Sequence, residues 1–192
     1  MWHPDRNPPE RVCRRQQLSI TLRKPVSKDA VELATLHVEC WKQTYSELLP
    51  EGFFTAQHLE QRISMWRRIL DDANPGFRIA VASDEQDRLV GFSFSAPLPK
   101  DATDVPEGIE RQLYNLYVLN DHHGSGTGQQ LLEAVLGDEP AMLWVAEKNP
   151  RAIAFYRRNG FAFDGLVERD PTAPLITDAR MVRLPEAAGA KA

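Results

Sequence analysis

The pattern of apolar and polar positions predicts one folded unit of strands and helices between residues 18 and 184. Residues 19–23 alternate small or apolar with polar side chains and stop before Pro25, which is typical of a short strand. Apolar residues at spacings of three and four then predict two successive amphipathic helices. Their stripes are Val31, Ala34, Val38, Trp41 and Tyr45, in a helix capped by Ser27, and Leu59, Ile63, Trp66 and Leu70, after Thr55.

The remainder of the pattern adds a hairpin and then strands that alternate with helices. The predicted hairpin pairs residues 77–81 with 89–94 across a polar turn, and a strand at 113–118 precedes a helix at 129–136. A buried-type strand at 142–146 is followed by a helix that Asn149 and Pro150 open and Gly160 ends. Two strands, 161–166 and 180–184, complete the order. It indicates an α/β or α+β domain whose mixed sheet carries helices on both faces.

The two ends of the chain lack such patterning. Residues 1–17 mix proline with charge, without the apolar run of a signal peptide, and residues 185–192 are small and unpatterned. We therefore predict a flexible N-terminal extension, one domain at 18–184 and a flexible C-terminal tail, since 192 residues suit a single core. Cys13 and Cys40 form no CxxC pair, and we interpret both as reduced thiols of a cytoplasmic protein.

Charge and histidine placement narrow the classes of partner. The net charge of −4 gives no basic footprint for nucleic acid, and no apolar run is long enough to cross a membrane. His122 and His123 are adjacent and lack a third ligand, so we expect no metal. The sequence leaves the oligomeric state open between a monomer and a homodimer.

The glycine-rich segment between the strand at 113–118 and the next helix is the main chemical signal. Gly124, Gly126 and Gly128 leave room for an anion, and the amides of residues 125–129 would point at it from a helix N-terminus. A dinucleotide fingerprint would need glycine where Gln129 stands, and a P-loop would need a lysine, which residues 101–147 lack. A tight turn without a ligand is the structural alternative.

Two motifs resemble those of the GCN5-related N-acetyltransferase (GNAT) superfamily. The frame at 123–128 matches the closing glycines of its acetyl-CoA signature, with His123 in place of the family's Arg or Gln, after a "LYV" strand end at 116–118. Residues 144–161 resemble the family's block from asparagine to "FYxxxGF". The resemblance implies a mostly antiparallel sheet splayed in the middle, acetyl-CoA as cosubstrate, and transfer of its acetyl group to a primary amine of a small molecule or peptide in a ternary complex.

The same resemblance implies roles for individual residues. Tyr156 is expected to protonate the departing CoA thiolate, and a bulge at 116–118 would free an amide for the thioester carbonyl. Trp41 and Tyr45 are expected to contact the acceptor. The expected cofactor contacts are Leu116, Tyr117, Val118, His123, Gly124, Ser125, Gly126, Thr127, Gly128, Gln129, Asn149 and Tyr156.

The residue that accepts the amine proton is not fixed by the motifs. Many family members place a glutamate near position 112 or 114, but this chain has Gln112, which cannot act as a base. Glu110 and Glu147 are the alternative bases, directly or through water. The missing carboxylate also leaves open a non-catalytic acyl-CoA-binding or sensor module, whereas a nucleotide-dependent kinase is disfavoured by the absent P-loop lysine.

Overall fold

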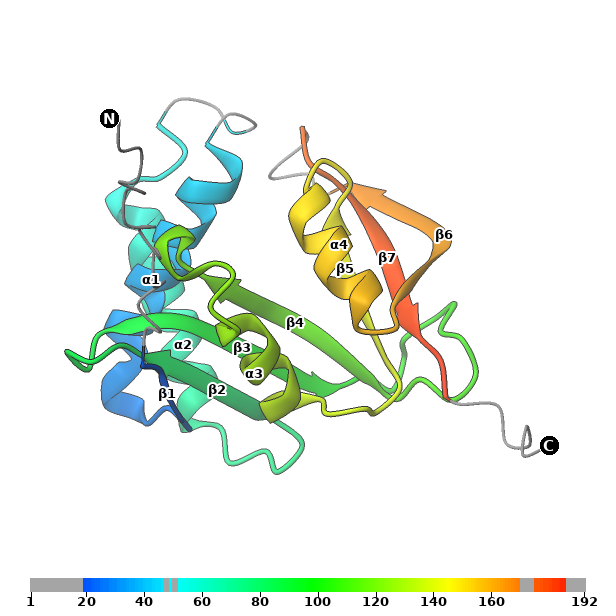
Figure 1. Ribbon diagram of the computed structural model, residues 1–192, viewed down its shortest axis with the longest axis horizontal. Helices are drawn as coiled ribbons and strands as arrows, with labels where there is room; N and C mark the ends of the chain where they lie inside the picture. Colours follow the sequence, from blue (N-terminus) through cyan, green and yellow to red (C-terminus); the bar gives the residue numbers. More distant parts are fainter. Residues whose placement is uncertain (1–18, 47–48, 50–51, 170–174, 186–192) are drawn as a thin grey trace, which may run out of the picture.

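The computed structural model describes residues 19–46, 49, 52–169 and 175–185, in which seven strands form one sheet between helices (Figure 1). The strands are β1 (Thr21–Arg23), β2 (Arg78–Ser83), β3 (Leu89–Pro97), β4 (Arg111–Val118), β5 (Ala141–Ala146), β6 (Ala162–Arg169) and β7 (Thr177–Arg183). The helices are α1 (Ala30–Tyr45), α2 (Ala56–Asp71), α3 (Thr127–Val135) and α4 (Pro150–Arg158), with 3-10 turns η1 (Ser27–Asp29) and η2 (Asn120–His122). This order confirms the predicted mixed α/β class. The predicted N-terminal extension, Leu18 and the tail beyond Pro185 lie outside the described residues.

The sheet consists of two halves that meet along one short contact. Its strand order is β1-β2-β3-β4-β5-β7-β6, and every neighbouring pair is antiparallel except β4 and β5. That parallel pair shares only two partners, Gln112 opposite Met142 and Leu113 opposite Leu143. Figure 1 shows the two strands diverging beyond this contact. The ladder that would normally satisfy the facing edges of β4 and β5 therefore ends there, and the gap becomes available to a ligand.

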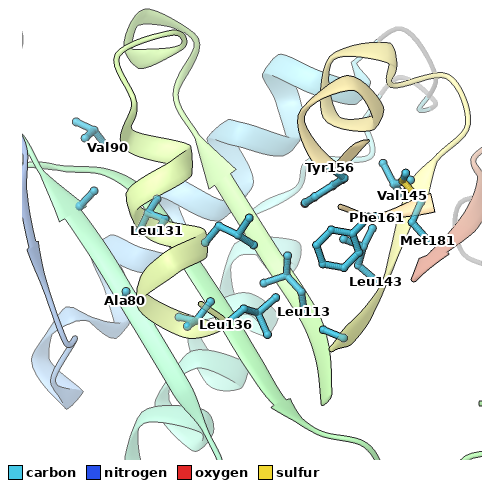
Figure 2. Close-up of a cluster of buried hydrophobic side chains, with 14 residues drawn as sticks. Ala80, Val90, Leu113, Leu131, Leu136, Leu143, Val145, Tyr156, Phe161 and Met181 are labelled. Carbon is cyan, nitrogen blue, oxygen red and sulfur yellow. The ribbon is translucent and has the colours of Figure 1, made fainter. Parts of the chain in front are cut away.

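Each face of the sheet has its own core. On one face, residues of α3 and α4 pack against β4, β5 and β7, and Figure 2 shows Tyr156 pointing from α4 toward Phe161 and Leu143. On the other face, α1 and α2 pack against β2 and β3 around the fully buried Trp66 and Phe92. The two helix pairs thus cover opposite faces, and the gap between β4 and β5 connects those faces.

The first helix buries a stripe that matches the predicted one only in part. Ser27 lies in η1, where its hydroxyl donates to Asp71 at 2.6 Å, and Asp29 takes the N-cap position instead. Val31 is 47% exposed. The buried positions are Ala30, Leu33, Ala34, Leu36, His37, Cys40 and Tyr45. Ala34 and Tyr45 are therefore buried as predicted, whereas the prediction missed Leu33 and the histidine that belong to the same buried face.

The core accommodates His37 because the ring is neutral. Desolvation lowers the pKa of His37 to about 3, and Trp66 Nε1 donates to its Nδ1 at 3.3 Å. Since Nδ1 accepts this bond, the ring proton sits on Nε2. A neutral imidazole surrounded by Trp41, Phe92 and Tyr117 then packs as an aromatic side chain.

Candidate functional site

A cleft of about 920 Å³ occupies the gap between the two halves of the sheet. Its walls come from β4, β5, the end of α1, the η2 turn with the glycine loop, the start of α3, and α4. The predicted site residues that line it are Tyr45, Leu116, Tyr117, Val118, His123, Gly124, Gly126, Gly128, Gln129, Asn149 and Tyr156. The structure therefore brings the two sequence motifs, which are separated by helix α3 and the start of β5, to one cavity.

The glycine loop leaves backbone donors free at the start of α3. Gly124 and Gly126 have φ angles of 76° and 91°, a region that side chains disfavour, and Gly126 is the N-cap of α3. The bond from Gln130 N to Gly126 O, at 3.1 Å, begins the helical ladder, so the N–H groups of Gly128 and Gln129 precede it. These donors and the helix dipole are suited to a phosphate group.

Serine and threonine side chains brace the loop rather than line the cleft. The hydroxyl of Ser125 donates to His122 O at 2.6 Å and lies 2.8 Å from the hydroxyl of Thr127. Thr127 is fully buried. Both residues were predicted to contact the cofactor through their amides, which stays a prediction, and in the structure their side chains hold the shape of the turn.

His123 connects the loop to the end of β4. Its Nε2 lies 2.8 Å from Val118 O, so Nε2 carries the proton and donates to the carbonyl. Its Nδ1 is buried without a partner among the described residues, as is Nδ1 of His122. His123, which departs from the family pattern, thus fixes the loop to β4 through Nε2 and keeps Nδ1 without a hydrogen bond among the described residues.

The strand β4 turns two peptide groups toward the cleft. Leu119 N donates to Val90 O at 2.9 Å, and residues alternate along an antiparallel pair, so the N–H groups of Leu116 and Val118 face away from β3. They face the gap in which β5 is absent as a partner. Two neighbouring amide donors at one edge of a cleft can bind a carbonyl oxygen.

The predicted bulge lies at another residue. Phe94 is opposite Asn115 and Ser95 is opposite Leu113, which leaves Tyr114 as the extra residue, whereas residues 116–118 keep a regular register with β3. The expectation of a bulge at 116–118 was wrong. The amides there are free because the sheet splays, not because the strand bulges.

Three tyrosines, of which Tyr45 and Tyr156 are buried, line the cleft together with Asn149. Trp41 Nε1 donates to Tyr117 Oη at 2.9 Å. Burial raises the pKa of Tyr45, while hydrogen bonds to Asn149 and Tyr117 act in the opposite direction. Desolvation, together with the charge of a Tyr45 phenolate, also raises the pKa of Tyr156. All three hydroxyls therefore stay protonated at neutral pH.

Asn149 joins the two halves of the site. Its Oδ1 accepts from Ala152 N at 3.1 Å and so caps α4, as predicted, while its side chain also bonds Tyr45 from α1. The position of Tyr156 is thereby tied to helix α1 on the opposite face of the sheet. Trp41, predicted to contact the acceptor, does not line the cleft, and its indole serves to hold Tyr117.

The two predicted carboxylate bases lie elsewhere. Glu110 and Glu147 are exposed, just before β4 and just after β5, and neither lines the cleft. The lining residues include no Asp or Glu.

Sequence reasoning also missed Arg151 and Arg158, which line the cleft from α4. Their separation of seven residues, two helical turns, was a signal that could have identified them as one basic face.

Residues 19–46, 49, 52–169 and 175–185 contain neither a cluster of metal ligands nor a membrane-spanning helix. No three His, Cys, Asp or Glu side chains there are close enough together to hold a metal ion. No described helix is long and apolar enough to cross a membrane.

The sequence is similar to a family of known proteins and to individual relatives within it. The family model described as "Acetyltransferase (GNAT) domain" matches residues 75–162. Peptidyl-lysine N-acetyltransferase YjaB of Salmonella typhimurium is 30% identical over 118 residues, which cover 58% of this chain and 81% of that protein. A Bacillus subtilis protein named "Uncharacterized N-acetyltransferase YuaI" is 29% identical over 145 residues, which cover 72% of this chain and 78% of that protein.

Solved structures agree on the fold. An acetyltransferase from Corynebacterium glutamicum, described as related to histone acetyltransferase HPA2, superposes with a TM-score of 0.65 at 20% identity and covers 90% of this chain and all of that one. PaiA N-acetyltransferase from Thermoplasma acidophilum, solved with coenzyme A, gives a TM-score of 0.60 at 20% identity over 88% of this chain and all of that one. The family model and the Salmonella relative, with the fold that these structures share, establish that the chain belongs to the GNAT superfamily and is an acetyl-CoA-dependent acyltransferase.

Proposed function

We propose that this enzyme transfers the acetyl group of acetyl-CoA directly to a primary amine while both reactants occupy the cleft between β4 and β5. The observation that carries the proposal is the splay itself. It exposes the N–H groups of Leu116 and Val118 at the same cavity that the glycine loop borders. We further propose that residues 18–184 form the single catalytic domain. Family membership supports this enzyme over a non-catalytic acyl-CoA sensor.

The residues present fit acetyl-CoA, which supplies the activated acetyl thioester. The free N–H groups of Gly128 and Gln129, together with Arg151 and Arg158, provide positive potential for its phosphates. Gly126 has no side chain to obstruct the loop, and Nδ1 of His123 has no partner among the described residues. The pantetheine arm would follow the free edge of β4.

The backbone of β4 would stabilise the charge that develops during attack. As the amine nitrogen bonds to the carbonyl carbon, negative charge grows on the carbonyl oxygen. The N–H groups of Leu116 and Val118 are fixed in the strand, so they need no reorganisation to donate to this oxygen. Removal of one such donor typically costs on the order of 10²-fold in rate.

Tyr156 is the proposed donor to the leaving sulfur. A free phenol has a pKa of about 10 and a thiol about 8.5, so proton transfer between the free groups would be nearly balanced. Burial raises the pKa of Tyr156 further, so full transfer from this hydroxyl is less favourable, and the hydroxyl is protonated when chemistry begins. A hydrogen bond that shortens as the C–S bond breaks would still assist departure.

The buried cysteine supports direct transfer. Cys40 is 2% exposed, and burial raises the pKa of its thiol to about 12, so it supplies almost no thiolate at neutral pH. It also does not line the cleft. A covalent acetyl-cysteine at this position is therefore disfavoured. Cys13 lies outside the described residues.

The amine must lose a proton without a carboxylate in the cleft wall. Glu110 and Glu147 stay as predicted bases, and their exposed positions favour action through water rather than direct contact.

The name of the Salmonella relative supports lysine side chains among the amines to test, beside small-molecule amines. The test is a panel of primary amines scored for release of free CoA thiol. Release with at least one amine is expected, and binding of acetyl-CoA with no release for any amine would contradict the proposal.

A further inference from the structure

A second hollow, of about 530 Å³, lies on the face of the sheet that α1 and α2 cover. It is bounded by the last turn of α2, the segment that leads into β2, the end of β3 with the following loop, and Tyr114 of β4. Its chemically distinctive lining residues are Phe77, Phe94, Tyr114, Arg68, Lys100 and Asp72. No family motif and no step of the proposed reaction involves this hollow.

Tyr114 connects the hollow to the catalytic cleft, since this residue lines both cavities. As the extra residue of the β4 bulge, it stacks on Phe94 with ring centroids 5.5 Å apart and planes inclined by 24°. Phe94 belongs to the core beneath α1 and α2. The glycine loop leads into α3, on the opposite face. An acceptor that enters the gap from the face opposite the glycine loop therefore passes Tyr114.

The floor of the hollow is aromatic. Phe77 packs edge-on against Phe94, with centroids 5.3 Å apart and planes at 77°, and Tyr114 extends the same surface. Tyr114 is 41% exposed although it is a large apolar ring beside a cavity. Such a surface gains free energy when a flat or branched apolar group covers it.

The rim carries an excess of positive charge. Arg68 and Lys100 have no ion pair with any residue that the structure describes. Asp72 is the only carboxylate of the lining, and its Oδ1 accepts a hydrogen bond from Asn74 N at 2.9 Å. The rim therefore carries two cations and one carboxylate, an excess of one positive charge, in a protein whose net charge is −4. This local imbalance is complementary to an anion.

We propose that this hollow binds the far end of the acceptor, and that the acceptor is an amine carrying an apolar body with a carboxylate remote from the amine. The inference rests on the proposed function, because it places the amine at the gap between β4 and β5. The apolar body would cover Phe94 and Tyr114, and the carboxylate would lie between Arg68 and Lys100.

A matched pair of acceptors tests the charge requirement. The pair is 4-(2-aminoethyl)benzoate and 4-(2-aminoethyl)benzamide, which have the same shape and the same amine. We expect kcat/KM for CoA release to favour the benzoate by about tenfold at low salt, as two partly exposed charge contacts allow, and the preference to shrink as salt rises. Equal values for the two amines, or release from neither while other amines react, would overturn the inference.

Variants then test the two cations. Arg68→Gln and Lys100→Gln should each lower kcat/KM for the benzoate by about threefold to fivefold and leave that for the benzamide unchanged. Arg67→Gln, at the exposed neighbouring position that does not line the hollow, is the matched control and should change neither. An equal loss for both amines would indicate a structural effect and contradict the assignment.

Calorimetry separates this inference from the catalytic proposal. The benzoate should bind the protein saturated with free CoA more tightly than the benzamide does, and Arg68→Gln should remove the difference. This result would hold even if no amine were acetylated. Conversely, if other amines release CoA but the benzoate shows no binding advantage, the proposed reaction stands and the anion site does not.

Discussion

The Nε2 atom of His123 lies 2.8 Å from the carbonyl oxygen of Val118, which ties the glycine loop to the end of β4. The same peptide segment presents the Val118 N–H to the cleft. A residue that departs from the family's Arg or Gln therefore joins the proposed phosphate-binding loop to the proposed donors for the carbonyl oxygen. Because Nε2 already donates to Val118, only Nδ1 can gain a proton.

This geometry predicts a pH-dependent affinity for acetyl-CoA. If the protonated ring faces the phosphates, affinity should fall as the pH rises across the range where histidines titrate, about 5 to 8. His123→Gln can still donate to Val118 but cannot gain a proton, so its affinity should fall less steeply with pH there than that of the parent. Titration calorimetry at several pH values makes the comparison. Identical profiles for the parent and the variant would place Nδ1 away from the phosphates.

Gly126→Val should weaken acetyl-CoA binding at least tenfold, about 1.4 kcal/mol, because the side chain would block the approach of the pyrophosphate and strain a backbone with φ of 91°. Gly137→Val is the matched control. Gly137 also has a positive φ, of 52°, but its Cβ would meet no atom within 4 Å and it does not line the cleft. Equal losses of affinity in both variants would attribute the effect to strain alone.

Tyr156→Phe should reduce turnover by about a hundredfold while acetyl-CoA affinity and the unfolding midpoint change little, since the ring and its packing remain. Because the pKa of Tyr156 is raised, the parent should keep this contribution to turnover up to at least pH 10. Single-turnover kinetics isolate the chemical step. Parent-like single-turnover rates in the variant would return Tyr156 to a packing role.

His37 predicts how stability responds to acid. Its folded-state pKa of about 3 lies below the ordinary value of 6.5, so the unfolded chain binds the proton first and stability is lost as the pH falls below about 6.5. The slope approaches about 1.4 kcal/mol per pH unit for one group. Urea unfolding of His37→Gln, which retains an acceptor for Trp66, should show a smaller slope between pH 6 and 4. An unchanged slope would assign the acid sensitivity to other groups.

Local signals in the sequence predicted the parts of the fold that depend on neighbours along the chain. Asn149, Pro150 and Gly160 delimit α4 as expected, because capping and a left-handed terminus act within a few residues. The glycine loop begins α3 for the same reason. Knowledge of the family supplied the splay, which no single segment encodes.

Features that depend on distant contacts were not predictable from local pattern. Trp41 and Tyr117 are 76 residues apart in the chain, yet their hydrogen bond decides that Trp41 holds the site together rather than lining it. The bulge at Tyr114 results from the register between β3 and β4. The exposed positions of Glu110 and Glu147 likewise follow from where the sheet ends, so their catalytic roles stay predictions.

The most direct test of direct transfer is the initial rate of CoA release, measured while acetyl-CoA and a reactive amine are varied against each other. Both reactants must be bound together before chemistry, so we predict double-reciprocal lines that intersect. The state of Cys40, buried and with a thiol pKa of about 12, predicts the same pattern. Parallel lines, the pattern of a covalent acetyl-enzyme, would contradict the account.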